Sequence, residues 1–343
     1  MDKPLSYDSL KSVLKHMNLK KREQIDYILP SLKTANSKFP YHLSKVTIGD
    51  WHLKINNRTW DVHPAFQKMN EPLTAEDVAA VEFVEIKGRA SIRFLVKYDE
   101  LFKYEYNQEI PQDNEELFKK LTDEYLKNGT RIDTLNIYSF PKCLEEKNPE
   151  TWQLKVSEFK MRNTDYATYL KIRPFILGSL PLKRLCFCFR EDTLPMFDDP
   201  LLQTCNKLFL QFPYYNPDPI NDVLMNLQNP HVQITYLNLP IERLQEVAQR
   251  WIRDRRPIGH TFSYSIENFD YILDCFEEFE LIFDAKPSRI TSLGTTYLSH
   301  AVTIPIDDVS EFVISGAKFD TYWPPFQWNL KMEVMPRGAT VPK

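Results

Sequence analysis

Glycine is scarce in this sequence, which has 8 glycines and 24 prolines among its 343 residues. So few glycines argue against phosphate-cradling loops, and so many prolines are typical of a fold built from numerous short elements. The sequence contains none of the motifs G-x-G-x-x-G, G-x-x-x-x-G-K-[ST], G-x-S-x-G or H-E-x-x-H. It therefore points to no catalytic residue, no metal site and no cofactor, although catalytic triads can assemble from residues far apart in a chain.

Cysteine is also rare, and its odd number predicts buried free thiols in a reducing compartment rather than disulfides. The closest pair, Cys186 and Cys188, has no second pair and no nearby histidine to complete a zinc site. We expect all of them to serve the core: Cys143, Cys186, Cys188, Cys205 and Cys275.

A charge excess and a long apolar run are both missing. The chain has 43 basic and 47 acidic residues, which gives a net charge of −4 and no electrostatic reason to expect a nucleic-acid or membrane partner. No run approaches the roughly 20 apolar residues of a membrane span. The opening MDKPLSYDSL has no apolar core of signal-peptide length. We therefore expect an intracellular protein, cytoplasmic or nuclear.

Residues 1–40 predict three short helices. Ser6 can cap the first, and apolar residues at helical spacing form one stripe on it, made of Leu10, Val13, Leu14 and Met17. Ile25, Ile28 and Leu29 supply a stripe for a second helix, which Pro30 closes. So small a unit cannot bury its stripes internally, so it must pack on the rest of the chain or on another protein.

Residues 41–110 change to a period of two, which predicts a small antiparallel sheet. One hairpin turns at Asn56 and Asn57 and returns through Trp60 and Val62. EFVEIKGRASIRFLVKY predicts a second hairpin, and residues 64–80 are expected to be helical or irregular.

Residues 111–343 alternate between strand and helix and end in a β-rich tail, so the fold class is α+β or α/β. The pattern apolar-x-x-Leu-x-apolar recurs, with central leucines Leu185, Leu208 and Leu237 lying 23 and 29 residues apart. An earlier copy is centred on Leu135, and a degenerate one lies around Leu154 and Val156. This approaches the period of leucine-rich repeats and predicts a curved parallel sheet. An ordinary α/β domain with coincidental spacing is the other interpretation.

Two basic clusters and one aromatic segment stand out as candidate binding surfaces. The first cluster, Lys20, Lys21 and Arg22, is either a solvated corner or a patch that attracts an acidic partner. The second lies in RWIRDRR, with Arg253, Arg255 and Arg256, at the end of a predicted helix, where cations offset the helix dipole. The aromatic segment YWPPFQWNLKMEV either closes a core or offers a ledge for an extended peptide.

The opening PLSYDSLKSVLKHMNLKKREQI resembles an F-box, with a Leu/Pro pair followed by apolar residues at helical spacing. More specifically, it resembles the start of a nematode-expanded family of F-box-C-type proteins, which continue into a long domain of unknown function. The similarity extends to WIRDRRPIGHTFSY. The resemblance implies that the helices bind an adaptor of the Skp1 type through Pro4, Leu5, Leu10, Val13, Leu14, Met17 and Ile25.

These observations leave three hypotheses. The first is a non-enzymatic adaptor in which residues 1–40 bind a Skp1-like subunit of a cullin ubiquitin ligase and the remainder captures an unknown protein substrate. The second is a protein-recognition module that does not bind Skp1, in which the N-terminal helices only cap the fold. The third is an enzyme of unrecognised type, which a polar pocket with converging titratable groups would favour.

Overall fold

The computed structural model describes residues 9, 12–14, 17, 19–68, 83–97, 103–161, 164–212, 221–235, 239–290, 297–318 and 328–343. The chain divides into two compact units, residues 1–180 and 181–343, a boundary that the sequence did not indicate. Each unit combines helices with a sheet, so the expected mixture of α and β structure is confirmed. No helix among the described residues is long and apolar enough to cross a membrane.

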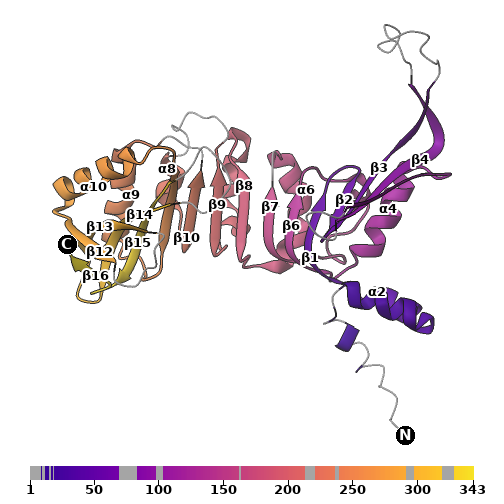
Figure 1. Cartoon of the computed structure of the whole chain (residues 1–343), viewed down its shortest axis with the longest axis horizontal. Helices are drawn as coiled ribbons and strands as arrows, with labels where there is room; N and C mark the ends of the chain where they lie inside the picture. The colour runs from indigo at the N-terminus through magenta and orange to yellow at the C-terminus, as the bar shows by residue number, and fades with distance from the viewer. Residues whose placement is uncertain are drawn as a thin grey trace. The chain divides into compact units, whose positions relative to one another are not determined.

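The first unit is built on a mixed sheet in which β1 joins a parallel part to an antiparallel part. Strand β1 pairs in parallel with β6, and β6 with β7, while β1 to β5 follow one another as an antiparallel meander (Figure 1). The order across this part is β7-β6-β1-β2-β3-β4-β5. The strands are β1 (His42–Ile48), β2 (His52–Ile55), β3 (Arg58–Lys68), β4 (Phe83–Lys97), β5 (Lys103–Ile110), β6 (Arg131–Ile137) and β7 (Lys155–Met161).

The predicted turn at Asn56 and Asn57 is confirmed, because it joins β2 to β3, with Ile55 opposite Arg58. Asn56 has a φ of 55°, a left-handed conformation that asparagine tolerates well. The second predicted hairpin is wrong. Residues 83–97 form one long strand that lies between β3 and β5, and residues 64–68 continue β3 rather than forming a helix. The rest of the stretch expected to be irregular, from 69 on, lies outside the described residues.

Helix α4 (Asn114–Tyr125) covers the sheet of the first unit at β3 and β4. Leu117 and Phe118, on the apolar face of α4, are buried. The cap is Asp113, whose carboxylate accepts hydrogen bonds from the amides of Glu115 and Glu116. The other helical segments here are α2 (Leu19–Ile28), η1 (Pro30–Leu32), α3 (Lys33–Ser37), α5 (Lys142–Glu145), α6 (Tyr166–Ile176) and η3 (Leu177–Ser179).

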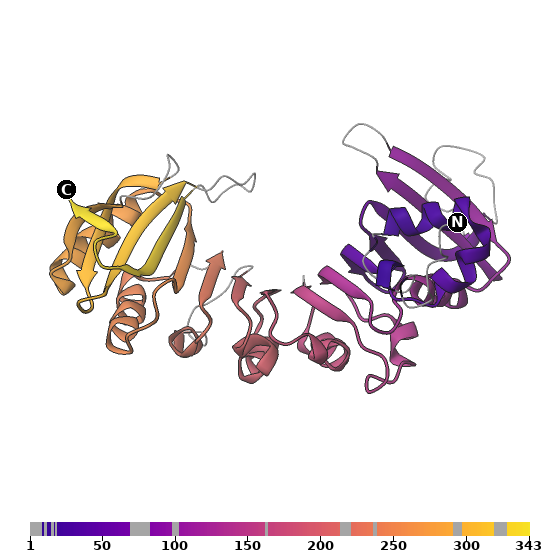
Figure 2. The ribbon, with the colours of Figure 1, turned by 90° about the horizontal axis from the view of Figure 1, so that it is seen from below.

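The second unit places four parallel strands beside an antiparallel set, in the order β8-β9-β10-β11-β15-β14-β13-β12-β16. Its rose to orange helices lie on one side of the parallel strands (Figure 2). The strands are β8 (Arg184–Cys188), β9 (Lys207–Gln211), β10 (His231–Thr235), β11 (Thr261–Ile266), β12 (Lys286–Ile290), β13 (Tyr297–Pro305), β14 (Ser310–Lys318), β15 (Trp328–Pro336) and β16 (Thr340–Pro342). The helical segments are η4 (Glu191–Asp198), α7 (Pro200–Gln203), α8 (Asn221–Asn226), α9 (Ile241–Arg253) and α10 (Asp270–Phe283).

The register of the parallel strands differs in one place from the predicted repeat. Leu185 lies opposite Leu208, as the pattern predicts. Leu208 lies opposite Val232, so the predicted alignment of Leu208 with Leu237 is wrong; Leu237 itself lies outside the described residues. The error arose because Val232 is not a leucine and was passed over. In the first unit, the degenerate copy predicted around Leu154 and Val156 falls on β7. Its residue opposite Leu135 of β6 is Phe159. A leucine-rich-repeat-like architecture remains a prediction.

The antiparallel strands of the second unit end in a short strand that returns to the sheet. Strand β16 pairs with β12, and the Glu311 carboxylate on β14 accepts hydrogen bonds from the Thr340 amide and hydroxyl at 2.9 and 3.0 Å. Thr303 Oγ1 donates to Thr340 Oγ1 at 3.1 Å. Glu311 is buried, yet its charge is satisfied by these donors. The predicted β-rich tail is therefore present, although residues 319–327 of the aromatic segment lie outside the described residues.

All five cysteines are free, and all except Cys188, which is partly exposed, are buried. The expectation of core thiols therefore holds for Cys143, Cys186, Cys205 and Cys275. Burial raises the pKa of both Cys205 and Cys275 to about 12, so these thiols stay protonated at neutral pH.

Candidate functional site: the N-terminal helices and the cavity beside α4

Helix α2 is fixed to the first unit by the buried side chain of Arg22. The guanidinium donates hydrogen bonds to the carbonyl oxygens of Pro40 at 2.7 Å and Phe39 at 3.0 Å. It also donates to the side-chain oxygen and the carbonyl oxygen of Asn36. Its carbon lies 4.0 Å from the centre of the Tyr41 ring. The cation thus satisfies the carbonyls that end α3 and lead into β1.

Arg22 was expected at the rim of a basic patch, and the structure corrects this. Burial lowers the pKa of Arg22, and the nearby Tyr41 and Asp26 partly offset that effect. A guanidinium nevertheless keeps its charge at neutral pH, and its planar fork matches several carbonyls at once. Lys20 and Lys21 are exposed, as expected. The physical signal was present in the sequence, since Arg22 falls one helical turn after Leu19, on the inward face.

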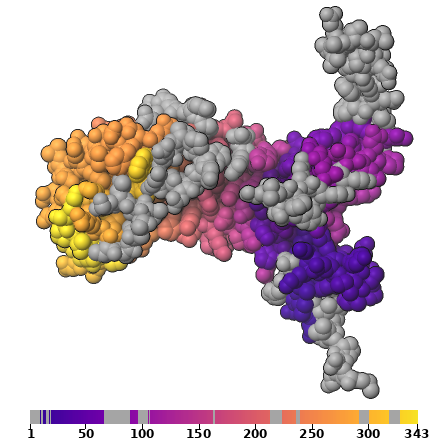
Figure 3. All heavy atoms as spheres, viewed as in Figure 1, coloured from indigo at the N-terminus to yellow at the C-terminus, as the bar shows by residue number. Residues whose placement is uncertain are grey.

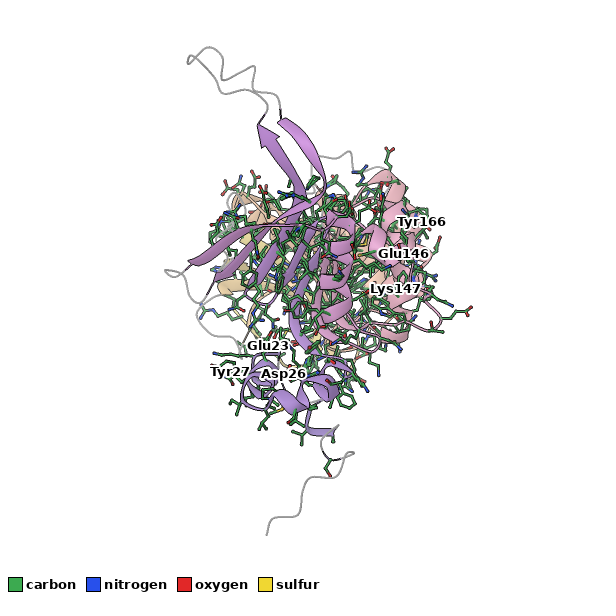
Figure 4. All side chains as sticks on the ribbon, turned by 90° about the vertical axis from the view of Figure 1, so that its right-hand side faces the viewer. Glu23, Asp26, Tyr27, Glu146, Lys147 and Tyr166 are labelled. Carbon is green, nitrogen blue, oxygen red and sulfur yellow. The ribbon has the colours of Figure 1, made fainter. Side chains whose placement is uncertain are left out.

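A second link joins α2 to the meander through the ion pair between Glu23 and Arg58 of β3. The hydrogen bond to Glu23 raises the pKa of Arg58. Asp26 accepts a further hydrogen bond from the Asn36 amide group at 2.8 Å. Figure 1 and Figure 4 both show α2 beside the end of the sheet rather than over one of its faces, and Figure 3 shows its indigo atoms as a protruding lobe.

The apolar side chains of the N-terminal helices are divided between core and solvent. Leu14, Leu19 and Phe39 are buried. Val13 is 44% exposed, whereas Tyr27 and Ile28 are 89% and 70% exposed. Leu29 is also exposed, and Met17 and Ile25 are intermediate. Pro4, Leu5 and Leu10 lie outside the described residues. We call Val13, Tyr27, Ile28 and Leu29 the exposed apolar set; the sequence did not single out Tyr27, the most exposed of them.

The second basic cluster is not one surface. Helix α9 ends at Arg253, which is exposed and pairs with Asp254, and Arg255 is exposed in a left-handed conformation with a φ of 48°. Arg256 is buried instead. Its guanidinium donates to the Leu227 carbonyl oxygen at 2.8 Å and lies 5.5 Å from the Trp251 ring centre. Arg256 is therefore part of the fold of the second unit and not of a partner patch.

A cavity of about 540 Å³ opens beside the first turn of α4, where the β1–β2 loop and α5 meet it. Its apolar wall comes from Trp51, Phe118 and Cys143. Its rim is charged and combines acidic with basic side chains, which are Asp50, Asp113, Glu115, Glu116, Glu146, Lys119 and Lys142. Sequence reasoning missed this site because its residues come from three separate segments and form no motif.

Ion pairs cross the rim of this cavity. Lys142 pairs with Glu115 at 2.9 Å, Lys119 pairs with Glu146, and Glu116 pairs with Lys120 at 3.1 Å. These hydrogen bonds lower the pKa values of Glu116 and Glu146, so both carboxylates are ionised at neutral pH. Burial raises the pKa of Cys143, which makes it a poor nucleophile. Within the described part of the chain no group of histidine, cysteine, aspartate and glutamate side chains is arranged to hold a metal ion.

Residues 113–268 match the family model of a domain of unknown function, DUF3557. The matched segment begins at Asp113, the cap of α4, and ends just after β11, so it includes strands β6 to β11. It therefore includes part of the cavity and excludes the N-terminal helices. No curated protein and no solved structure matches the chain.

Proposed function

We propose that this protein is a non-enzymatic adaptor whose N-terminal helices bind a Skp1-like subunit of a cullin ubiquitin ligase, while the rest of the chain captures a protein substrate. The observation that carries the proposal is the exposed apolar set, of which Tyr27, Ile28 and Leu29 lie at or directly after the C-terminal end of α2, the helix that Arg22 holds in place. The side chains that would dock are already oriented by a buried anchor, which lowers the cost of ordering on association. The resemblance of the opening to F-box-C-type proteins supports the choice of partner.

The energetics of such docking are favourable in outline. Burying three or four large apolar side chains contributes about 1.5–3 kcal/mol each. Association costs at least about 4 kcal/mol, so the upper end of this range approaches the roughly 8 kcal/mol of a micromolar complex. The exposed Lys20 and Lys21 lie on the same helix and would speed the encounter with an acidic adaptor.

The test is a binding measurement between the full chain and a purified Skp1-type adaptor, with Ile28→Asp as the disrupting variant. Val309→Asp is a matched control, because Val309 is 67% exposed and lies in the second unit. We expect Ile28→Asp to weaken binding by at least about tenfold, since a carboxylate replaces a buried apolar contact. Val309→Asp should bind as the native chain does. No binding by the native chain, or equal binding by Ile28→Asp, would refute the proposal.

A second candidate function is protein recognition without a Skp1-like partner, in which the N-terminal helices cap the fold. The burial of Leu14 and Leu19 and the link from Arg22 to Pro40 favour it. Removal of residues 1–39 separates the two functions. If the helices only cap the fold, the shortened chain loses stability and the full chain ignores the adaptor. If they are a docking module, the full chain binds the adaptor and the shortened chain stays folded.

A further inference from the structure

The cavity beside α4 has walls that are fixed before any ligand arrives. Asp113 caps α4 by accepting a hydrogen bond from the Glu115 amide at 2.8 Å. The β1–β2 loop is held by the Asp50 amide, which donates to the Ser139 hydroxyl at 2.8 Å. That loop passes so close to Ser139 that a Cβ on Gly49 would lie 3.4 Å from its hydroxyl oxygen. A ligand therefore meets a formed site of a volume typical of ligand pockets.

The wall of the cavity offers an aromatic surface. Trp51 is partly exposed, and its ring lies 6.0 Å from the Phe118 ring in an edge-on arrangement that fixes the indole. Phe118 and Cys143 are buried behind it. A partly exposed indole in a rigid cavity attracts cations over its face, because the ring quadrupole is negative there.

The charges of the rim favour the same kind of ligand. Five carboxylates line the cavity against two lysines. Lys142 and Lys119 pair with Glu115 and Glu146, and Lys120, outside the lining, pairs with Glu116, which leaves the carboxylates of Asp50 and Asp113 in excess. The excess is therefore negative after internal pairing. The positive end of the α4 dipole does not reverse this, because Asp113, Glu115 and Glu116 all lie at its first turn.

We propose that this cavity binds an arginine side chain presented by an extended segment of a protein partner. A guanidinium stacks flat on an indole and at the same time donates paired hydrogen bonds to carboxylates at its edge. An apolar ligand would leave the rim carboxylates desolvated, and an anion would be repelled by them. A lysine ammonium supplies the charge but cannot stack as a plane.

The site bears on the proposed function through its place on α4. The C-terminal end of this helix meets the elements that hold α2, since the Tyr125 ring lies 6.1 Å from the Tyr41 ring. The cavity lies at the other end of its 12 residues, about 18 Å away along the axis. Figure 4 shows Glu146 and the labelled residues of α2 at separate places on the unit. A substrate arginine and an adaptor would therefore bind without competing.

The inference that the arginine belongs to a substrate rests on the proposed function. Whether the cavity binds arginine at all is measured with peptides, in the absence of the adaptor. The probes are three capped five-residue peptides of glycine and serine with arginine, citrulline or lysine at the centre. Citrulline keeps the shape of arginine and removes its charge. Binding to the full chain is followed by calorimetry and by the indole N–H resonance of Trp51, which Trp51→Phe identifies.

We expect the arginine peptide to bind at least about tenfold more tightly than the citrulline peptide and more tightly than the lysine peptide. Glu115→Gln/Glu146→Gln should weaken arginine binding by about fivefold or more. Glu246→Gln, a control in an exposed ion pair of α9, should change nothing. Equal binding of arginine and citrulline, or of arginine and lysine, overturns the proposal, and so does an unchanged Glu115→Gln/Glu146→Gln variant.

Two cross-checks separate this proposal from the proposed function. Ile28→Asp should leave the affinity for the arginine peptide unchanged, because Ile28 lies on α2 and does not line the cavity. The Glu115→Gln/Glu146→Gln variant should keep the affinity for the adaptor. A chain that binds the peptide and not the adaptor therefore refutes only the adaptor, and the reverse result refutes only the cavity ligand.

Discussion

Helices α2 and α9 each have a buried arginine that lies over an aromatic ring, Arg22 within α2 and Arg256 just after α9, yet the two helices are held in opposite ways. Helix α9 buries an apolar stripe that includes Leu244, Val247 and Trp251. Helix α2 buries Leu19 and Arg22 and leaves Tyr27 and its C-terminal neighbours in solvent. Helix α9 is held mainly by its apolar stripe, and Arg256 packs beside it. Helix α2 has little buried apolar surface, and the hydrogen bonds of Arg22 hold it instead.

The difference teaches how a short helix can be rigid without burying its apolar side chains. Arg22 makes four hydrogen bonds, three of them to the carbonyl oxygens of Asn36, Phe39 and Pro40 around the end of α3. Charged hydrogen bonds are directional, so the helix is oriented as well as attached. Its apolar residues then remain available for another molecule.

Trp251→Ala should have the largest effect of the changes that probe this comparison. The ring is buried against Phe262 and Phe312, and its loss leaves a cavity in the second unit. We expect the free energy of unfolding of that unit to fall by about 4 kcal/mol. Denaturant unfolding followed by hydrogen exchange of the β11 and β15 amides measures it. A loss below about 1 kcal/mol would contradict the view that an apolar stripe holds α9.

Arg22→Met should release α2 while leaving the sheets intact. The variant removes a buried cation together with its hydrogen bonds to the carbonyls of Asn36, Phe39 and Pro40, at a cost of about 3 kcal/mol. Amide exchange in α2 and α3 should accelerate strongly, and exchange in β6 should not. Lys20→Met, on the exposed side of α2, is the control. Unchanged protection of α2 in Arg22→Met would show that apolar contacts alone hold it.

Arg256→Met should cost less than Arg22→Met, by roughly 2 kcal/mol. Arg256 donates to one carbonyl, that of Leu227, and its stem already packs on an apolar helix. The methionine keeps much of that packing, so we expect a loss of about 1 kcal/mol in thermal unfolding of the second unit. Equal losses for the two substitutions would remove the distinction between the helices.

The smallest expected effect is a difference in pH dependence. Burial lowers the pKa of His260, and the positive charge of Arg256 adds to this. His260 therefore binds a proton more readily in the unfolded chain than in the folded one. Neutral His260 contributes fully to the free energy of unfolding above pH 6.5, and this contribution is lost as the pH falls below that value. Burial and the charges of Lys207 and Lys331 lower the pKa of His231 in the same direction, and Glu333 opposes them.

We therefore expect the melting temperature of the second unit to fall by about 1–2 °C between pH 7.5 and pH 5.5, as in a small loss of stability. His260→Gln should reduce this slope. Protection of α2 should not change over the same interval, because an arginine anchor does not titrate there. A steeper loss of α2 protection than of β11 protection would contradict this assignment.

The sequence predicted best those elements whose position depends on a local pattern. Helix α9 followed from its 3.6-residue period, and the turn between β2 and β3 followed from Asn56 and Asn57. Residues 83–97 do not form the predicted hairpin, because pairing with both β3 and β5 keeps β4 extended over its whole length. The frame of β10 was missed because its position opposite Leu208 is a valine.

The candidate sites were harder to predict because they depend on long-range contacts. Arg22 was placed on the surface by its charge, and only its carbonyl partners, 14 to 18 residues further on, make its burial favourable. The cavity joins Trp51 to Phe118 and Cys143, residues separated by more than sixty positions. No local sequence pattern indicates that these residues are in contact, so the cavity can be identified only from the three-dimensional structure.

The return of β16 to β12 has a consequence for the protein in a crowded solution. An unpaired outer strand is a template on which other chains can add and begin to aggregate. Here the strand beyond β12 has only three residues, and one of them, Pro342, has no N–H to offer a newcomer. The Glu311 carboxylate accepts two hydrogen bonds from Thr340 and so holds β16 in place, and this short strand covers the edge of β12.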